Sequence, residues 1–208
     1  MEYNKEKKEI ITDRELSNLD KLVLKFIKIL EKHVDYVIIS GYVSILLGRS
    51  RATEDVDVFI NKIHINVFSK LYDELINSGF WCLNAEKVKD IYSFLEDGLA
   101  VRFSEEGKPV PNFEVKFPKR DVDKETFNDF IIVKLNEGKL KISSLERQIA
   151  FKRYYLCSDK DIEDALHIEK TFKNQISFKE IERLKNIIER IKKDEKNKKF
   201  FTFSKQEI

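Results

Sequence analysis

The segment Asp55-Val56-Asp57-Val58-Phe59-Ile60 constrains the fold more than any other part of the chain. Acidic and β-branched residues alternate in its first half, and a β-strand places alternating side chains on opposite faces of a sheet. The pattern therefore predicts a strand whose valines face a core. It also predicts that Asp55 and Asp57 share the other face, with their backbones about 7 Å apart.

The segment before this strand predicts a second buried strand and a turn. Tyr36-Val37-Ile38-Ile39 is short, apolar and mostly β-branched, and Ser40-Gly41 closes it. We expect a strand that turns into a short helix over 42–47, with Gly48 as its C-cap. Further upstream, Thr12 and Glu15 have the spacing of a capping box, which predicts a helix from there to about residue 33.

The remaining periodicities predict a mixed sheet followed by helices. Helical patterns cover 65–77 and 86–95, and strand patterns cover 80–83, the hairpin 99–103 with 113–117, and the pair 130–133 with 140–142. After residue 142 every strong element is helical, and serine caps predict helices over 143–156, 158–172 and 177–195. We therefore expect an α/β (α+β) fold in two domains: a mixed β-sheet domain with packed helices, 1–142, and a C-terminal helical module, 143–208.

Composition excludes several classes of protein. The chain has 208 residues, of which 42% are hydrophobic and 37% charged, as expected for a globular domain. It holds no run of about 18 apolar residues, and its first residues are charged, unlike those of a signal peptide. We therefore expect a cytoplasmic protein with no membrane contact. Cys82 and Cys157 lie far apart and the three histidines are scattered, which predicts neither a disulfide framework nor a zinc site.

Charge adds little to this assignment. The net charge of +2 does not by itself require a nucleic-acid partner. Residues 177–208 hold 10 Lys and Arg against 6 Asp and Glu. A solvated helix end is the more common explanation of such a run, and RNA contact is the alternative.

Residues 40–57 predict a site for a nucleotide and a metal. Two carboxylates on one strand face suit Mg²⁺ (or Mn²⁺), which usually binds through one or two carboxylates and substrate phosphates. The turn at Ser40-Gly41 would offer backbone N–H groups to phosphate, and Arg49 or Arg51 could neutralise its charge. The alternatives are an exposed strand edge for the aspartates, a simple tight turn, and surface salt bridges for the arginines.

These motifs in this order resemble the nucleotidyltransferase superfamily, which has the polymerase-β-like fold. Its signature is hG[GS] followed at a short distance by Dh[DE]h. Here Gly41-Tyr42 is followed by 12 residues, 43–54, and then by Asp55-Val56-Asp57-Val58. The small pair is Ser40-Gly41 where the superfamily has Gly-Gly or Gly-Ser. In this superfamily a third carboxylate on a neighbouring strand completes the site and can act as general base, and Glu114 is our candidate. The alternative for Glu114 is an exposed hairpin position paired with Lys116.

The fuller pattern is most similar to the AbiEii-type toxin nucleotidyltransferases and related uncharacterised proteins. In that group a lysine on a later helix and a D-x-x-D segment complete the motifs. Residues 145–152, which end in Lys152, resemble the first, and Asp161-Ile162-Glu163-Asp164 resembles the second. The resemblance implies that Lys152 contacts nucleotide phosphate and that Asp161 or Asp164 helps to position substrate. The alternatives are a solvated helix residue for Lys152 and, for Asp161, an acid that complements the helix N-terminus after Ser158.

Together these features predict an enzyme that moves an NMP from an NTP to an acceptor hydroxyl on RNA such as tRNA, on a protein or on a small molecule. The expected cofactor is Mg²⁺ or Mn²⁺. The expected catalytic and metal-binding residues are Asp55, Asp57 and Glu114, and the expected phosphate ligands are Ser40, Gly41, Arg51 and Lys152. The alternative is a protein of the same fold without catalysis, which binds nucleotide or RNA or forms part of a toxin–antitoxin pair with a cognate antitoxin.

Overall fold

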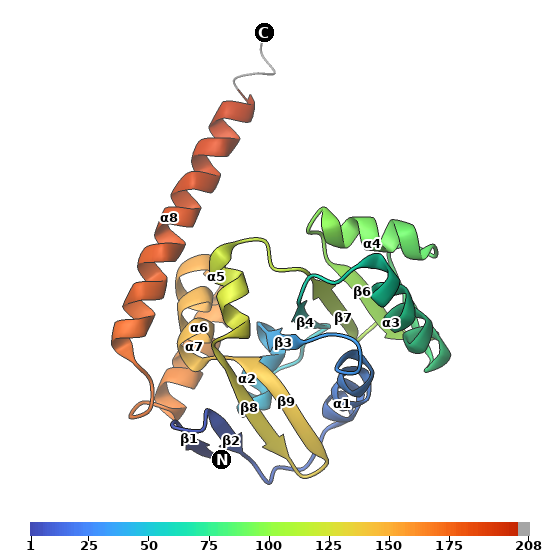
Figure 1. The fold of residues 1–208 in the computed structure, drawn as a ribbon. Helices are drawn as coiled ribbons and strands as arrows, with labels where there is room; N and C mark the ends of the chain where they lie inside the picture. The colour runs from blue at the N-terminus through green and yellow to red at the C-terminus, as the bar shows by residue number, and fades with distance from the viewer. Residues whose placement is uncertain (204–208) are drawn as a thin grey trace. The chain divides into compact units, whose positions relative to one another are not determined.

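The computed structural model describes residues 1–203, and its contacts divide the chain into two compact units (Figure 1). The first unit is Met1–Ser144, and the second begins at Leu145. Each unit has its own buried core and is described by itself.

A nine-stranded mixed sheet forms the centre of the first unit. The strands are β1 Glu2–Asn4, β2 Glu9–Ile11, β3 Tyr36–Ile39, β4 Asp55–Ile60, β5 Phe80–Cys82, β6 Val101–Glu105, β7 Asn112–Lys116, β8 Phe130–Leu135 and β9 Gly138–Ser143. Their order across the sheet is β1-β2-β8-β9-β3-β4-β7-β6-β5. β4 runs antiparallel to β3 and parallel to β7, which is in turn antiparallel to β6. The expected α/β class with a mixed sheet and packed helices is confirmed.

Helices and aromatic side chains cover this sheet. The helices of the first unit are α1 Asn18–Leu30, α2 Gly41–Leu46, α3 Ile65–Asn77, α4 Val88–Glu96 and α5 Asp121–Lys124, with a 3₁₀ turn at Glu125–Phe127. Phe26 of α1 stacks on Phe113 of β7 with ring centroids 3.9 Å apart, and its ring meets Phe80 edge-on at 5.2 Å. Because Phe113, Val56 and Val58 are all buried, Asp55 and Asp57, which alternate with the valines, project to the opposite face of the sheet.

The N-terminal segment differs from the sequence-based expectation. Thr12 and Glu15 do not start a helix: residues 9–11 pair with β8, and the Thr12 N–H extends that ladder to the carbonyl of Lys134 at 3.1 Å. The capping box is formed instead by Ser17 and Asp20, at the start of α1. The ladder satisfies backbone groups at residues 9–12, so the helix begins only where the chain leaves the sheet.

The second unit is helical. It contains α6 Leu145–Ala150, a π-helical segment at Phe151–Leu156, α7 Asp159–Thr171 and α8 Phe178–Phe203. Apolar side chains from α6, α7 and α8 form its core, among them Ile149, Ile168, Leu184 and Ile188. The sequence predicted one helix over 143–156 and a third helix ending near 195, whereas the first is partly π-helical and α8 continues to Phe203. The division at residue 142 into independent domains stays a prediction.

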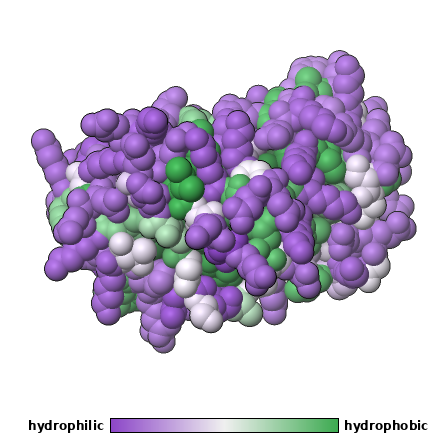
Figure 2. All heavy atoms as spheres, turned by 90° about the horizontal axis from the view of Figure 1, so that it is seen from below, coloured by the Kyte–Doolittle hydropathy of each residue, from purple (hydrophilic) through white to green (hydrophobic). Residues whose placement is uncertain are grey.

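The surface agrees with the composition. Figure 2 shows a face that is mainly hydrophilic, with smaller apolar patches between charged side chains. Within residues 1–203, none of the helices combines the length and the apolar character needed to cross a bilayer.

Candidate active site

Three carboxylates lie together on one face of the sheet. Asp55 and Asp57 project from β4, while Val56 and Val58 between and after them are fully buried. In the parallel pairing of β4 with β7, Asp57 is directly opposite Glu114, and Asp55 is opposite Asn112. Side chains opposite each other on neighbouring strands project to the same face. The structure thus brings together the three acids that the sequence singled out.

Two basic residues bind these acids. Lys116 Nζ lies 2.6 Å from Asp57 Oδ1. Arg102 of β6 donates to Glu114 Oε1 from Nε at 2.8 Å and from Nη2 at 2.6 Å. The alternative pairing of Glu114 with Lys116 is therefore wrong, because the register places Arg102 opposite Glu114 and Lys116 opposite Phe59. Glu114 is the largest influence that raises the pKa of Arg102, and the charges of Asp55 and Asp57 raise it further.

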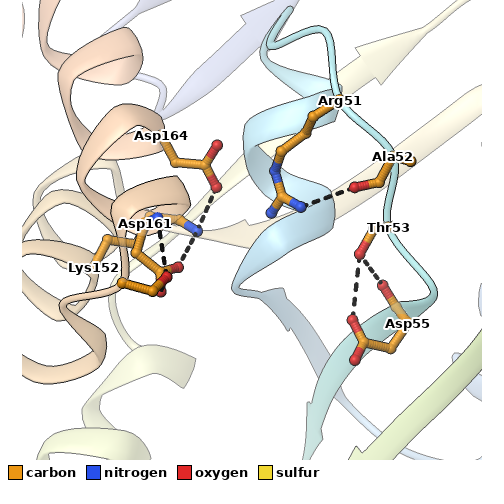
Figure 3. A network of polar contacts seen from close by, with 8 residues as sticks. Arg51, Ala52, Thr53, Asp55, Lys152, Asp161 and Asp164 are labelled. Atoms are coloured by element: carbon orange, nitrogen blue, oxygen red, sulfur yellow. Dashed lines mark hydrogen bonds and ion pairs between the residues drawn. The ribbon is translucent and has the colours of Figure 1, made fainter.

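Asp55 has a neutral partner. Thr53 Oγ1 lies 3.0 Å from the backbone carbonyl of Asp55 and 3.3 Å from its Oδ1 (Figure 3). The neighbouring Asn112 donates from Nδ2 to the carbonyl of Glu54 at 3.2 Å, which fixes the orientation of its amide. Its Oδ1 is buried and accepts no hydrogen bond within the described part of the chain. An oxygen acceptor without a donor beside a carboxylate is the kind of group that a hard cation or a bound hydroxyl can satisfy.

This donor set fits a magnesium-type ion. All of its ligands are oxygens, and Mg²⁺ needs only one or two carboxylates when water and substrate phosphates supply the rest. No cluster of three or more His, Cys, Asp or Glu side chains within residues 1–203 is arranged to hold a metal. The fit therefore rests on Asp55 and Asp57, with Glu114 held one strand away by Arg102.

The turn before α2 is strained. Ser40 has φ 63° and ψ −134°, in the positive-φ region that favours glycine. A non-glycine residue in such a conformation costs about 1–3 kcal/mol, and strain of this kind is common at functional sites. This is the position at which the superfamily pattern has glycine, so the departure noted in the sequence has a structural cost here.

Gly41 makes room for an arginine. A Cβ atom at Gly41 would lie 2.6 Å from Arg51 Nη2 and 3.4 Å from Thr53 Oγ1, so the guanidinium group lies against the backbone of the turn. Arg51 Nη1 also donates to the carbonyl of Ala52 at 3.0 Å (Figure 3). The turn at 40–41, Arg51 and the segment that ends in Asp55 are thus neighbours in the first unit, as the motif order predicted.

Lys152 belongs to a buried ion cluster in the second unit. Its side chain is 1% exposed, and Nζ lies 2.9 Å from Asp164 Oδ2 and 3.5 Å from Asp161 Oδ1 (Figure 3). The interpretation of Lys152 as a solvated helix residue is wrong, because the π-helical turn directs it between these two acids. Asp161 is also an acid in the first turn of α7, as the alternative expected, and Ser158 caps that turn by accepting from the Asp161 backbone N–H at 3.3 Å.

Sequence reasoning missed Arg102, Lys116 and Asn112. All three lie on the hairpin strands at positions that alternate with buried residues, which is the signal that could have found them. Which acid each of them meets depends on the strand order β4-β7-β6, which the sequence pattern does not specify.

Comparisons with known proteins support the fold. No family model matches the sequence, and no curated protein does so either. Among solved structures, the chain is similar to an antigenic nucleotidyltransferase-like protein from Paracoccidioides brasiliensis, with 19% identity, a TM-score of 0.51 and coverage of 82% of this chain and 87% of that chain. It is also similar to the antibiotic-resistance factor ANT(2'')-Ia, with 13% identity, a TM-score of 0.54 and coverage of 87% and 96%. The chain therefore has the fold of nucleotidyltransferase-like proteins, as the resemblance implied, and the closer likeness to AbiEii-type toxins stays a prediction.

Proposed function

We propose that this protein is a metal-dependent nucleotidyltransferase that moves an NMP from an NTP to an acceptor hydroxyl. The observation that carries the proposal is the placement of Asp55 and Asp57 on one strand face beside Glu114 of the parallel neighbour. The strained turn at Ser40 and the guanidinium of Arg51 against Gly41 support it, because backbone N–H groups and a cation at one turn in the same unit would suit phosphate.

In the proposed reaction the acceptor oxygen attacks the α-phosphorus, and the bond from that phosphorus to the oxygen that bridges it to the β-phosphate breaks. Asp55 and Asp57 would hold Mg²⁺ or Mn²⁺, which when bound neutralises phosphate charge. Glu114 would accept the proton of the acceptor hydroxyl, and its Oε2 is suited to this because Arg102 binds Oε1. The backbone at Ser40 and Gly41, together with Arg51, would bind the β- and γ-phosphates until pyrophosphate leaves.

The proposed role of Lys152 is a contact to nucleotide phosphate, with Asp161 or Asp164 positioning substrate. The ammonium of Lys152 is already bonded to both acids, so this contact requires phosphate to replace a carboxylate. The exchange is costly because the cluster is buried.

We infer that the helical module would select the acceptor. Tyr154, Glu189, Lys192, Lys193 and Lys196 line a cavity of about 350 Å³, and the ammonium of Lys185 lies 5.6 Å from the centroid of the Tyr154 ring. Three lysines beside an aromatic ring suit a phosphodiester backbone with a stacked base, which favours RNA such as tRNA as acceptor. A protein or a small molecule is the other candidate acceptor, and the label-transfer screen described below separates these classes. A cognate antitoxin is a further candidate partner.

The alternative function is nucleotide binding without transfer. The observations that favour it are the ion pairs on Asp57 and Glu114 and the serine at position 40. Such a protein would bind NTP with Mg²⁺ and release it unchanged.

A label-transfer screen tests the proposal. The purified protein is mixed with each α-³²P NTP, Mg²⁺ or Mn²⁺, and total tRNA, protein extract or aminoglycosides as acceptors. We expect label on one acceptor class with the wild type and none with Asp55→Asn/Asp57→Asn. Metal-dependent NTP binding with no transfer to any acceptor would favour the alternative, and label transfer that survives in the double variant would overturn the assignment of the site.

A further inference from the structure

The face that carries Asp55, Asp57 and Glu114 also carries two cations of its own. Three carboxylates stand against the ammonium of Lys116 and the guanidinium of Arg102. With all five groups ionised, the face carries three negative charges and two positive charges. Most of its charge is thus compensated within the protein before any ligand binds.

The two pairs differ in how strongly they are held. The two acids are similarly buried, with Asp57 13% and Glu114 16% exposed, but the side chain of Lys116 is 26% exposed whereas that of Arg102 is 53% exposed. Solvent and salt screen a partly buried pair much less than an exposed one. Lys116 is therefore the stronger of the two competitors for the carboxylates of this face.

A divalent cation and Lys116 compete for the same atom. Mg²⁺ lies about 2.0–2.1 Å from its ligand oxygens. The Lys116 ammonium is 2.6 Å from Asp57 Oδ1. A metal ion bound to this oxygen would therefore lie next to the ammonium, and the two positive charges would repel each other. Asp55 is different, because its side chain meets the neutral hydroxyl of Thr53.

We propose that Lys116 is a positioning residue that sets the metal affinity of this face: it occupies Asp57 in the ligand-free protein and moves to a nucleotide phosphate when metal and NTP bind. This inference rests on the proposed function. Metal alone then binds weakly, because it must first displace the ammonium of Lys116 from Asp57. Metal with nucleotide binds much better, because the triphosphate offers Lys116 a replacement partner within reach of its flexible stem. Arg102, which binds Glu114, lowers the metal affinity of the face in the same way but to a smaller extent.

The test measures Mn²⁺ binding by the EPR signal of free Mn²⁺, in the absence of nucleotide and then with a non-hydrolysable NTP analogue. The variants are Lys116→Met, the site variant Asp57→Asn and the control Lys62→Met, which removes an exposed lysine 3.3 Å from Glu96. We expect Lys116→Met to bind Mn²⁺ alone at least tenfold more tightly than the wild type, and Lys62→Met to be unchanged. The analogue should improve Mn²⁺ affinity strongly in the wild type and much less in Lys116→Met.

The outcomes separate this inference from the proposed function. Equal Mn²⁺ affinity of Lys116→Met and the wild type, with binding lost in Asp57→Asn, would overturn the role of Lys116 and leave the metal site intact. No Mn²⁺ binding by any of the proteins, with or without the analogue, would overturn both. Thermal unfolding checks that each variant is folded. If Lys116→Met is not folded, Lys116→Gln replaces it, with the same expected gain in Mn²⁺ affinity.

Discussion

The two acid–lysine clusters of this protein differ in solvent exposure. Lys116 and Asp57 lie on an open sheet face and are 26% and 13% exposed. Lys152 and Asp164 lie inside the helical unit and are 1% and 0% exposed. Both lysine–carboxylate distances are short, 2.6 Å and 2.9 Å, so distance alone does not distinguish their roles.

The difference lies in what happens when a partner is removed. A buried charge that loses its partner keeps its full desolvation cost, whereas a partly exposed charge regains water or binds a ligand. The pair in the helical unit is therefore suited to hold structure. The pairs on the sheet face are suited to exchange partners, which is what a site for metal and phosphate requires.

The largest expected effect is on the stability of the helical unit. Lys152→Met leaves Asp164 buried without its ammonium, and we expect a loss of about 3–5 kcal/mol in the free energy of unfolding. Urea unfolding followed by circular dichroism measures it. The double variant Lys152→Met/Asp164→Leu should recover most of the loss. A variant with only Lys152→Met that is as stable as the wild type would contradict a structural role for this cluster.

The next largest effect is on nucleotidyl transfer, and it concerns the Asp57–Lys116 pair on the sheet face. Asp57→Asn removes a carboxylate from the sheet face, and we expect transfer to fall by about 10²-fold or more. We also expect the unfolding free energy to fall by only about 1 kcal/mol, well below the loss in Lys152→Met, because the Lys116–Asp57 pair is partly exposed and Lys116 can regain water. The label-transfer assay measures the loss of transfer, and urea unfolding measures the change in the free energy of unfolding. A large loss of stability with little loss of activity would reverse the comparison.

A buried polar contact in the first unit tests whether burial, rather than membership of the helical unit, makes a polar pair important for stability. The Tyr42 hydroxyl donates to the fully buried Asp20 at 2.7 Å. Burial, and then the charge of Asp20, raise the pKa of Tyr42 far above its ordinary value. The unfolded chain loses this proton above about pH 10 while the folded protein keeps it, so this contribution to stability is complete below that pH and is lost as pH rises.

Tyr42→Phe should therefore flatten the alkaline loss of stability. Urea unfolding at several pH values above 10 should give a slope that is shallower by about 1.4 kcal/mol per pH unit than that of the wild type. Tyr36, whose pKa burial also raises, still titrates in the variant and leaves a residual slope. Identical slopes in the two proteins would show that Tyr42 is not buried as a neutral hydroxyl.

The smallest expected effect concerns the strained turn. Ser40→Gly removes the cost of a positive φ and should stabilise the first unit by about 1 kcal/mol. Thermal unfolding of the variant should therefore shift upward. Destabilisation by glycine would mean that the Ser40 side chain contributes more than its conformation costs.

The sequence predicted the parts of the site that depend on local pattern. Alternation in Asp55–Val58 was sufficient to place both aspartates on one face, and the hairpin pattern placed Glu114 on a strand with its apolar neighbours buried. The position of Arg51 near the turn followed from motif order. These features depend on neighbours in sequence, where side-chain periodicity is a reliable guide.

The remaining features depend on contacts between distant segments. The sequence pattern predicts a capping box at Thr12 because it contains no sign that residues 9–11 pair with the distant strand β8. The alternative of a solvated position for Lys152 is wrong because a π-helical turn shifts the face on which it lies. The partners of Asp57 and Glu114 were missed because the strand order, not the sequence spacing, brings Lys116 and Arg102 to them.

The central claim is that metal and nucleotide bind at the face formed by β4 and β7. Paramagnetic broadening by Mn²⁺ tests it without knowledge of the acceptor. With a non-hydrolysable NTP analogue present, substoichiometric Mn²⁺ should broaden the backbone NMR signals of Asp55, Asp57 and Glu114 first, and Asp55→Asn/Asp57→Asn should abolish this. Broadening centred on other residues, or unchanged in the double variant, would contradict the account.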